Sequence, residues 1–169
     1  MGTHSPRGRL TFLLDAVIEL GSTAVLSQSG GLSMHILRRG PRLGLVFSGV
    51  VSLGNCADIG VCDMLEYFLA DAETPDAVLI HLNLPVLLSY RHVDMLGNVL
   101  KAVADIKADH GGRTQFALIL RSDGEPEVER RKQACRLDAM RDGIPAFEDF
   151  AEAATALAAF GFRLRFLAR

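Results

Sequence analysis

The stretch Thr23-Ala24-Val25-Leu26-Ser27-Gln28-Ser29-Gly30-Gly31 joins a short apolar run to a turn of hydroxyls and glycines. The run Thr23–Leu26 predicts a buried strand, and a helix is expected near Leu32–Arg39, which Pro41 ends. Short apolar runs and longer amphipathic stretches alternate along the rest of the chain. The apolar runs are continuous, which is typical of strands covered on both faces. The pattern therefore predicts an α/β fold with a central parallel sheet.

The other expected elements follow the same alternation. Leu10, Leu13, Leu14, Val17 and Ile18 fit one face of a first helix that would end near Gly21. Further strands are expected at Leu43–Leu53, Ala77–Leu82, Phe116–Leu120, Ile144–Phe147 and Phe162–Leu167. Further helices are expected at Val61–Ala70, Val93–Asp109, Glu125–Met140 and Phe150–Ala159. Residues 1–9 are expected to form a disordered leader, and residues 10–169 a single domain.

Composition excludes several classes of protein. The net charge of −2 argues against a dedicated nucleic-acid binder, which needs a basic excess. No apolar run reaches the roughly 18 residues that cross a bilayer, so no membrane partner is expected. Three cysteines without a CxxC motif indicate a reduced protein, for which the cytoplasm is the default. A chain of 169 residues is also too short for a complete multi-substrate ligase.

Polar residues follow four of the expected strands. Because ligands of such folds gather at the carboxyl ends of the strands, these residues are the candidate site. They are Ser27, Gln28, Ser29, Gly30 and Gly31 after the first strand, Ser52, Gly54, Asn55 and Asp58 after the second, Asn83 after the third, and Arg121 and Ser122 after the fourth.

The turn Ser27–Gly31 has two interpretations. A helix N-terminus with glycines presents free N–H groups and a partial positive charge, so it favours a phosphate or carboxylate. Alternatively, Ser29 caps the helix and the glycines form a tight turn. The string matches neither the Walker motif nor the dinucleotide motif. The loop from Ser52 to Asp58 is likewise either a turn with a capping Asp58 or a loop that faces a substrate.

Histidine and cysteine give no metal or nucleophile motif. The histidines lack the spacing of metal ligands, and each is expected to be structural or on the surface. Cys135 lies in a charged helix and is expected to be a packed thiol.

Taken in order, three strings resemble the NDP-forming acyl-CoA synthetases, relatives of succinyl-CoA synthetase. The strings are residues 23–32 (TAVLSQSGGL), residues 47–58 (FSGVVSLGNCAD), and residues 63–68 (DMLEYF) with residues 71–74 (DAET). The resemblance is to one domain, the flavodoxin-like succinyl-CoA-ligase domain, over about Ser22 to Ala159. It implies a flavodoxin-like three-layer fold.

The resemblance also implies roles for residues. Family members form acyl-CoA from an acid, CoA and ATP or GTP through a phosphohistidine. Their SQSG-type turn opens a helix that stabilises the phosphorylated histidine, which would assign phosphate binding to Ser27, Gln28, Ser29, Gly30 and Gly31. The loop Ser52–Asp58 would line the same site.

The chain departs from the family after the fourth expected strand. The family places its phosphorylated histidine in a small-residue loop there, whereas Arg121–Asp138 contains no histidine and reads as a charged helix. No catalytic residue and no metal ligand is therefore assigned. The CoA-binding and ATP-grasp domains have no counterpart in the chain, so no cofactor is expected on the chain alone.

Two hypotheses remain. In the first, the chain belongs to a split acyl-CoA synthetase and requires an ATP-grasp subunit and a CoA-binding domain or subunit, which would bring CoA and ATP or GTP. In the second, it is a non-catalytic binding or assembly module that kept the fold. A homodimer is compatible with the composition. A receiver-like signalling domain is weaker, because Ser27 and Asn83 stand where such domains need acids.

Overall fold

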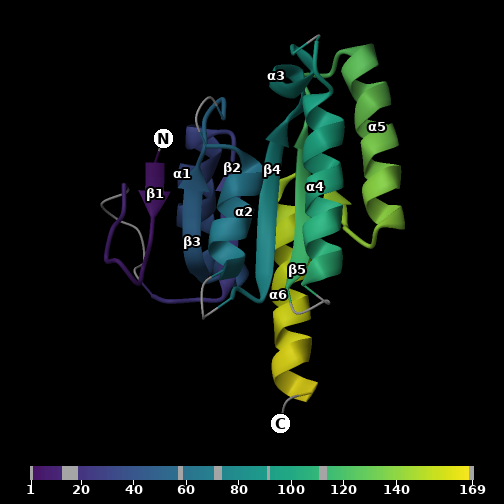
Figure 1. Ribbon diagram of the computed structural model, residues 1–169. Coiled ribbons are helices and arrows are strands. Elements are labelled where there is room, and N and C mark those ends of the chain that lie inside the picture. Colours follow the sequence, from purple (N-terminus) through teal and green to yellow (C-terminus); the bar gives the residue numbers. More distant parts are fainter. Residues whose placement is uncertain are drawn as a thin grey trace.

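A sheet of six strands in the order β1-β3-β2-β4-β5-β6 crosses the molecule (Figure 1). This computed structural model describes residues 2–12, 19–56, 59–70, 74–90, 92–110 and 114–167. The strands are β1 (Gly2–His4), β2 (Thr23–Ser27), β3 (Phe47–Ser52), β4 (Ala77–Asn83), β5 (Gln115–Arg121) and β6 (Ala146–Phe147). All neighbouring strands pair in parallel except β1, which runs antiparallel to β3. The parallel strands have the flavodoxin-like order, which confirms the predicted fold class.

Helices cover both faces of this sheet. They are α1 (Gly30–Arg39), the 3₁₀ helix η1 (Pro41–Leu43), α2 (Val61–Ala70), α3 (Leu84–Leu88), α4 (Met95–Asp109), α5 (Pro126–Arg141) and α6 (Phe150–Leu167). One core cluster joins β-strand side chains to α2, α3, α4 and α5, and the other joins them to α1 and α6. Every residue of β2 and all but the last residue of β4 are buried, as expected for strands between two layers. The molecule therefore has three layers.

The second strand is shorter than predicted. It begins at Phe47 and not at Leu43, because Pro41–Leu43 form η1 and Gly44 has a φ of 84°. Pro41 lacks the N–H that a strand would use, and the left-handed backbone at Gly44 turns the chain before it extends.

The predicted last strand, Phe162–Leu167, is wrong. These residues continue α6, whose buried side chains Phe150, Ala153, Ala154 and Leu157 face the sheet. The final turns of α6 project beyond the layers, where Phe162 and Phe166 are exposed (Figure 1). Extending an existing helix costs less than starting a strand that has no partner, so the aromatic run stays helical.

The amino-terminal segment is the third difference. A disordered leader was expected over residues 1–9, but Gly2–His4 pair with β3, with Gly2 opposite Ser52 and His4 opposite Val50. The pairing satisfies backbone groups of β3 that would otherwise lie at an open edge. The helix predicted from Leu10 to Ile18 falls largely on residues 13–18, outside the described residues.

The predicted helix Val93–Asp109 is confirmed as α4, which begins at Met95, two residues after the predicted start. A short helix that was not predicted, α3, precedes it at Leu84–Leu88. Asp94 caps α4, because its Oδ1 accepts the Gly97 N–H at 3.0 Å. Helix α2 has the predicted bounds, and the helices α1 and α5 are close to them.

Candidate functional site

The N-terminus of α1 opens at the carboxyl edge of the sheet. Ser29 is its N-cap, since Ser29 Oγ accepts the Leu32 N–H at 3.2 Å. Gly30 and Gly31 are the first two helical residues and have negative φ, so they do not form the expected tight turn. Both are exposed, and their N–H groups have no hydrogen-bond partner among the described residues. A Cβ added at Gly31 would meet no atom within 4 Å. Two exposed backbone donors are therefore left without a partner among the described residues.

Ser27 organises this turn from inside the protein. Its fully buried Oγ accepts the Ser29 N–H at 3.0 Å and lies 3.1 Å from the Ser29 carbonyl oxygen. Ser27 Oγ also lies 3.1 Å from Nδ1 of His81 on β4. The Ser27 hydroxyl is thus held by protein groups, and it fixes the backbone that presents Ser29 and the two glycines.

His81 stands directly beside Ser27, its register partner in the neighbouring strand. It is 1% exposed, and its Nε2 has no hydrogen-bond partner among the described residues. Burial, with a smaller effect from the cationic Arg121, lowers the pKa of His81 from 6.5 to about 4. The ring is therefore neutral at neutral pH, as befits the structural role expected for the histidines.

Gln28, which follows β2, forms hydrogen bonds to β4 and to the loop after β3. Its Oε1 accepts the Asn83 N–H at 2.8 Å, and its Nε2 donates to Cys56 Sγ at 3.4 Å. Its own N–H donates to the carbonyl oxygen of His81 at 3.3 Å. The side chain is buried, so Gln28 braces the switch point between β2 and β4 from within.

The remaining predicted residues lie around the same edge. Ser52, at the end of β3, lies against α1, because its Oγ would be 3.7 Å from a Cβ on Gly30. Gly54 has a φ of 62° and Asn55 is exposed in the turn after β3. Asp58 falls outside the described residues.

Arg121 brings a cation to this edge. It lies opposite Asn83 in the pairing of β4 with β5, and its side chain is exposed. Ser122, in contrast, closes its own turn, since its Oγ accepts the Gly124 N–H at 3.0 Å. The carboxyl edge thus carries free helix amides after β2 and, two strands away, the exposed guanidinium of Arg121, and both attract an oxyanion. In the described part of the chain, no group of three or more His, Cys, Asp or Glu residues could hold a metal ion.

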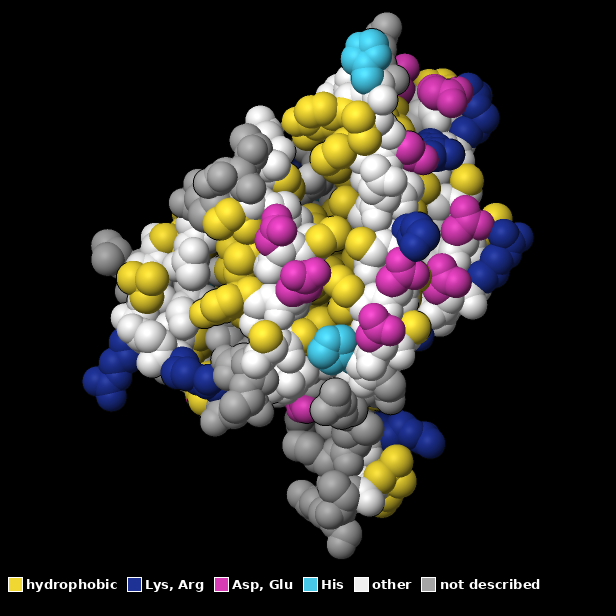
Figure 2. All heavy atoms as spheres, in the orientation of Figure 1, with side chains coloured by type: hydrophobic (Ala, Val, Ile, Leu, Met, Phe, Trp, Pro, Cys, Tyr) yellow, Lys and Arg dark blue, Asp and Glu magenta, His cyan; other side chains and the backbone are white. Residues whose placement is uncertain are grey.

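An apolar cavity of about 250 Å³ lies on the other face of the same edge. Its lining comes largely from α2 and α4 and includes Gln28, Cys56, Cys62 and Val99. Figure 2 shows hydrophobic side chains gathered in the furrow between these two helices. Burial, together with the carboxylates of Asp63 and Glu66, raises the pKa of Cys62, so this thiol stays protonated. Burial also raises the pKa of Cys135, which packs in the core as expected.

Among the described helices, none is both long enough and apolar enough to span a bilayer.

Most of the carboxyl-edge site, from Ser27 to Asn83, lies in a segment that matches known proteins. Residues 20–83 match the family model described as the succinyl-CoA ligase like flavodoxin domain. An ADP-forming acetate–CoA ligase of Methanocaldococcus jannaschii is 49% identical over 59 residues, which are 35% of this chain and 8% of that protein. The alpha subunit of ADP-forming acetate–CoA ligase II of Pyrococcus furiosus is 33% identical over 82 residues, 48% of this chain and 17% of the relative. The matched segments thus span less than a fifth of these relatives.

Solved structures share the fold over most of the chain. The dinucleotide-forming acetyl-coenzyme A synthetase 1 of Ca. Korarchaeum cryptofilum, in complex with phosphate and ADP, has a TM-score of 0.65 at 19% identity. That likeness covers 90% of this chain and 33% of the other. ATP citrate lyase of Methanothrix soehngenii, in complex with citrate and coenzyme A, has a TM-score of 0.61 at 14% identity, over 85% and 25% of the two chains. The resemblance to the NDP-forming acyl-CoA synthetases is thereby confirmed at the level of one flavodoxin-like domain.

Sequence reasoning missed the contact between Ser27 and His81. Each residue stands four positions after the first residue of its strand, and Thr23 pairs with Ala77. Aligning the two apolar runs by their starts would have placed the two side chains together, because parallel neighbours that share a register also share a face.

Proposed function

We propose that this chain contributes an oxyanion-binding helix N-terminus to an acyl-CoA-forming complex and is inactive alone. The observation that carries the proposal is the pair of free N–H groups at Gly30 and Gly31, presented by the Ser29 cap. The partial positive charge of the α1 N-terminus favours a phosphate or carboxylate there. The guanidinium of Arg121 at the same edge adds attraction for an anion.

Three features support a role as one part of a larger ligase. The matched segment of residues 20–83 includes the α1 turn. The relatives are whole synthetases or a named alpha subunit, of which the matched segments span 8–17%. The segment after β5 folds as α5, and Arg121–Asp138 contains no histidine that could carry a phosphoryl group. An ATP-grasp subunit and a CoA-binding domain or subunit would bring CoA and ATP or GTP to the complex.

The direct experiment is an acyl-CoA assay with the purified chain. We expect no acyl-CoA from ATP or GTP, CoA and short carboxylic acids when the chain is alone, because residues 121–138 offer no histidine to accept a phosphoryl group. Turnover by the chain alone would contradict the proposal.

The anion site is tested separately with inorganic phosphate. Ser29→Glu places a carboxylate at the mouth of the site and is expected to abolish phosphate binding. Thr155→Glu adds the same charge on the exposed side of α6 and serves as the matched control. Equal phosphate binding by both variants would contradict the assignment of the site.

The alternative function is a non-catalytic binding or assembly module. It is favoured by the way Ser27 and Gln28 use their polar atoms within the fold. A purified ATP-grasp subunit that yields acyl-CoA only when this chain is added would support the split enzyme. A stable complex without turnover, given CoA-binding partner and substrates, would support the module.

A further inference from the structure

A concave surface of about 910 Å³ runs along the exposed side of α1 and onto η1. Its lining begins at Gly31 and includes Met34, His35, Arg38, Arg39 and Arg42. The volume falls in the range of about 300–1,000 Å³ that is usual for ligand pockets. The surface is therefore large enough for a ligand of several linked groups.

The charge of this surface is one-sided. Among the described residues, the lining holds three arginines and a histidine and has no Asp or Glu, although the chain as a whole has 20 acidic residues and 18 Lys and Arg. Arg39 and Arg42 form no ion pair with any residue that the structure describes. The arginines of α5, in contrast, pair with acids: Arg130 with Glu127, Arg131 with Asp94, Arg136 with Glu148 and Arg141 with Asp138.

The helix dipole accounts for only part of this cluster. Arg38 and Arg39 lie in the last turn of α1, where a cation stabilises the helix C-terminus. Arg42 lies beyond the helix, on η1, and serves no such role for α1. The dipole of α1 therefore does not account for Arg42.

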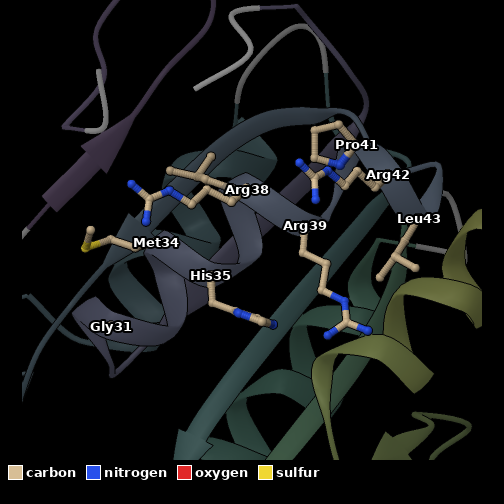
Figure 3. A pocket seen from close by; sticks show the side chains of 9 residues that line it. Gly31, Met34, His35, Arg38, Arg39, Pro41, Arg42 and Leu43 are labelled. Atoms are coloured by element: carbon tan, nitrogen blue, oxygen red, sulfur yellow. The ribbon is translucent and has the colours of Figure 1, made fainter. Parts of the chain in front are cut away.

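The three arginine side chains spread around the end of α1 and do not meet at one point (Figure 3). Arg39 extends on the same side of the helix as His35, whereas Arg38 extends with Met34 (Figure 3). Separated cations suit a ligand with more than one anionic group better than a single small anion. Guanidinium groups bind phosphate with two parallel hydrogen bonds and also stack on flat rings.

We propose that this surface, here called the α1 arginine surface (Met34, His35, Arg38, Arg39, Arg42 and Leu43), binds a nucleoside diphosphate or a ligand of that class. Its phosphates would contact Arg39 and Arg42, and its base would lie against a guanidinium and the apolar side chains of Met34 and Leu43. The surface reaches Gly31 at one end, but its cations are separated from the free amides of α1. The ten-residue helix is about 15 Å long, and the arginines lie at its opposite end.

The test is a calorimetric titration of the intact chain with ADP, with pyrophosphate and with adenosine. We expect ADP to bind more tightly than pyrophosphate, and adenosine not to bind detectably. The double variant Arg39→Glu/Arg42→Glu should weaken ADP binding by at least tenfold. Binding of the wild-type chain should also weaken as salt is raised, because the contacting groups are exposed charges.

Two controls separate this surface from the α1 N-terminus. Lys101→Glu reverses an exposed cation on α4 and should leave ADP affinity unchanged. Phosphate binding at the α1 N-terminus should persist in Arg39→Glu/Arg42→Glu, so failure of the phosphate site and failure of this surface are distinguishable. ADP binding that survives Arg39→Glu/Arg42→Glu, or no ADP binding at millimolar concentration, would overturn the proposal. Binding of polyglutamate in place of ADP would overturn it in favour of an acidic protein segment.

Discussion

At the scale of single residues, His81 makes the stability of the domain depend on pH. Its pKa in the folded chain is about 4, against 6.5 for an unperturbed histidine. Between these values the unfolded chain binds more protons, so the free energy of unfolding should fall as pH decreases from 6.5 toward 4. The slope due to this one group is at most about 1.4 kcal/mol per pH unit. His4, whose pKa burial also lowers, acts in the same direction.

Urea unfolding at pH 7, 6 and 5 measures this effect. His81→Leu removes the titrating group, so the variant should lose less stability than the wild-type chain between pH 6.5 and 5. Identical pH slopes for the two proteins would show that His81 is not buried and neutral in the folded state.

Gln28 is the second residue whose effect is specific. Gln28→Ala removes the acceptor of the Asn83 N–H and the donor to Cys56, and should lower the free energy of unfolding by about 1–3 kcal/mol. Gln133→Ala, on the exposed side of α5, is the matched control and should be nearly neutral. Equal effects of the two substitutions in urea unfolding would contradict the bracing role of Gln28.

At the scale of elements, alanine substitutions of two glycines at opposite ends of α1, Gly31 and the C-cap Gly40, are expected to have different effects on stability. A Cβ on Gly40, at the end of α1, would lie 2.2 Å from Cζ of Phe47 and 2.9 Å from the carbonyl oxygen of Ile36. Gly40→Ala should therefore destabilise the domain by about 1–3 kcal/mol through overpacking. Gly31→Ala meets nothing within 4 Å and should leave the stability unchanged or raise it by up to about 1 kcal/mol. Thermal unfolding compares the two, and an equal loss in both would refute the close packing of α1 on β3.

The elements also show where sequence reasoning succeeds. The strands β2, β4 and β5 and the helices α2 and α5 were predicted closely, because continuous apolar runs and amphipathic periods record burial directly. The strand predicted at Phe162–Leu167 was wrong, since an apolar aromatic run gives the same local pattern in a strand and in an exposed helix end. The pairing of Gly2–His4 with β3 depends on a distant strand edge, which local sequence does not record.

The candidate site was predictable only in outline. The strand ends at Ser27, Ser52, Asn83 and Arg121 follow from the order of the apolar runs, and the structure brings them to one edge. Which residues of the α1 turn are buried and which are exposed was not predictable. Ser27 and Gln28 are buried, whereas Gly30 and Gly31 are exposed. That difference depends on side-chain contacts between β2 and β4, which are far apart in sequence.

At the scale of the whole molecule, the chain has the fold of one domain of the solved acyl-CoA synthetase. The likeness to the solved synthetase covers 90% of this chain but 33% of that one. The chain itself presents free helix amides at the carboxyl edge and a separate cluster of arginines on the exposed side of α1. Both features are suited to anions. A Cβ on Gly31 would meet no atom within 4 Å, and the arginines line a concave surface of about 910 Å³.

The central claim is that an oxyanion binds at the amino-terminal end of α1, and its most direct test is a phosphate titration followed by ¹H–¹⁵N NMR. We predict that the amide signals of Gly30 and Gly31 shift most and saturate together, and that Ser29→Glu abolishes these shifts while Thr155→Glu preserves them. Unchanged Gly30 and Gly31 signals at saturating phosphate, or equal shifts in the Ser29→Glu variant, would contradict the account.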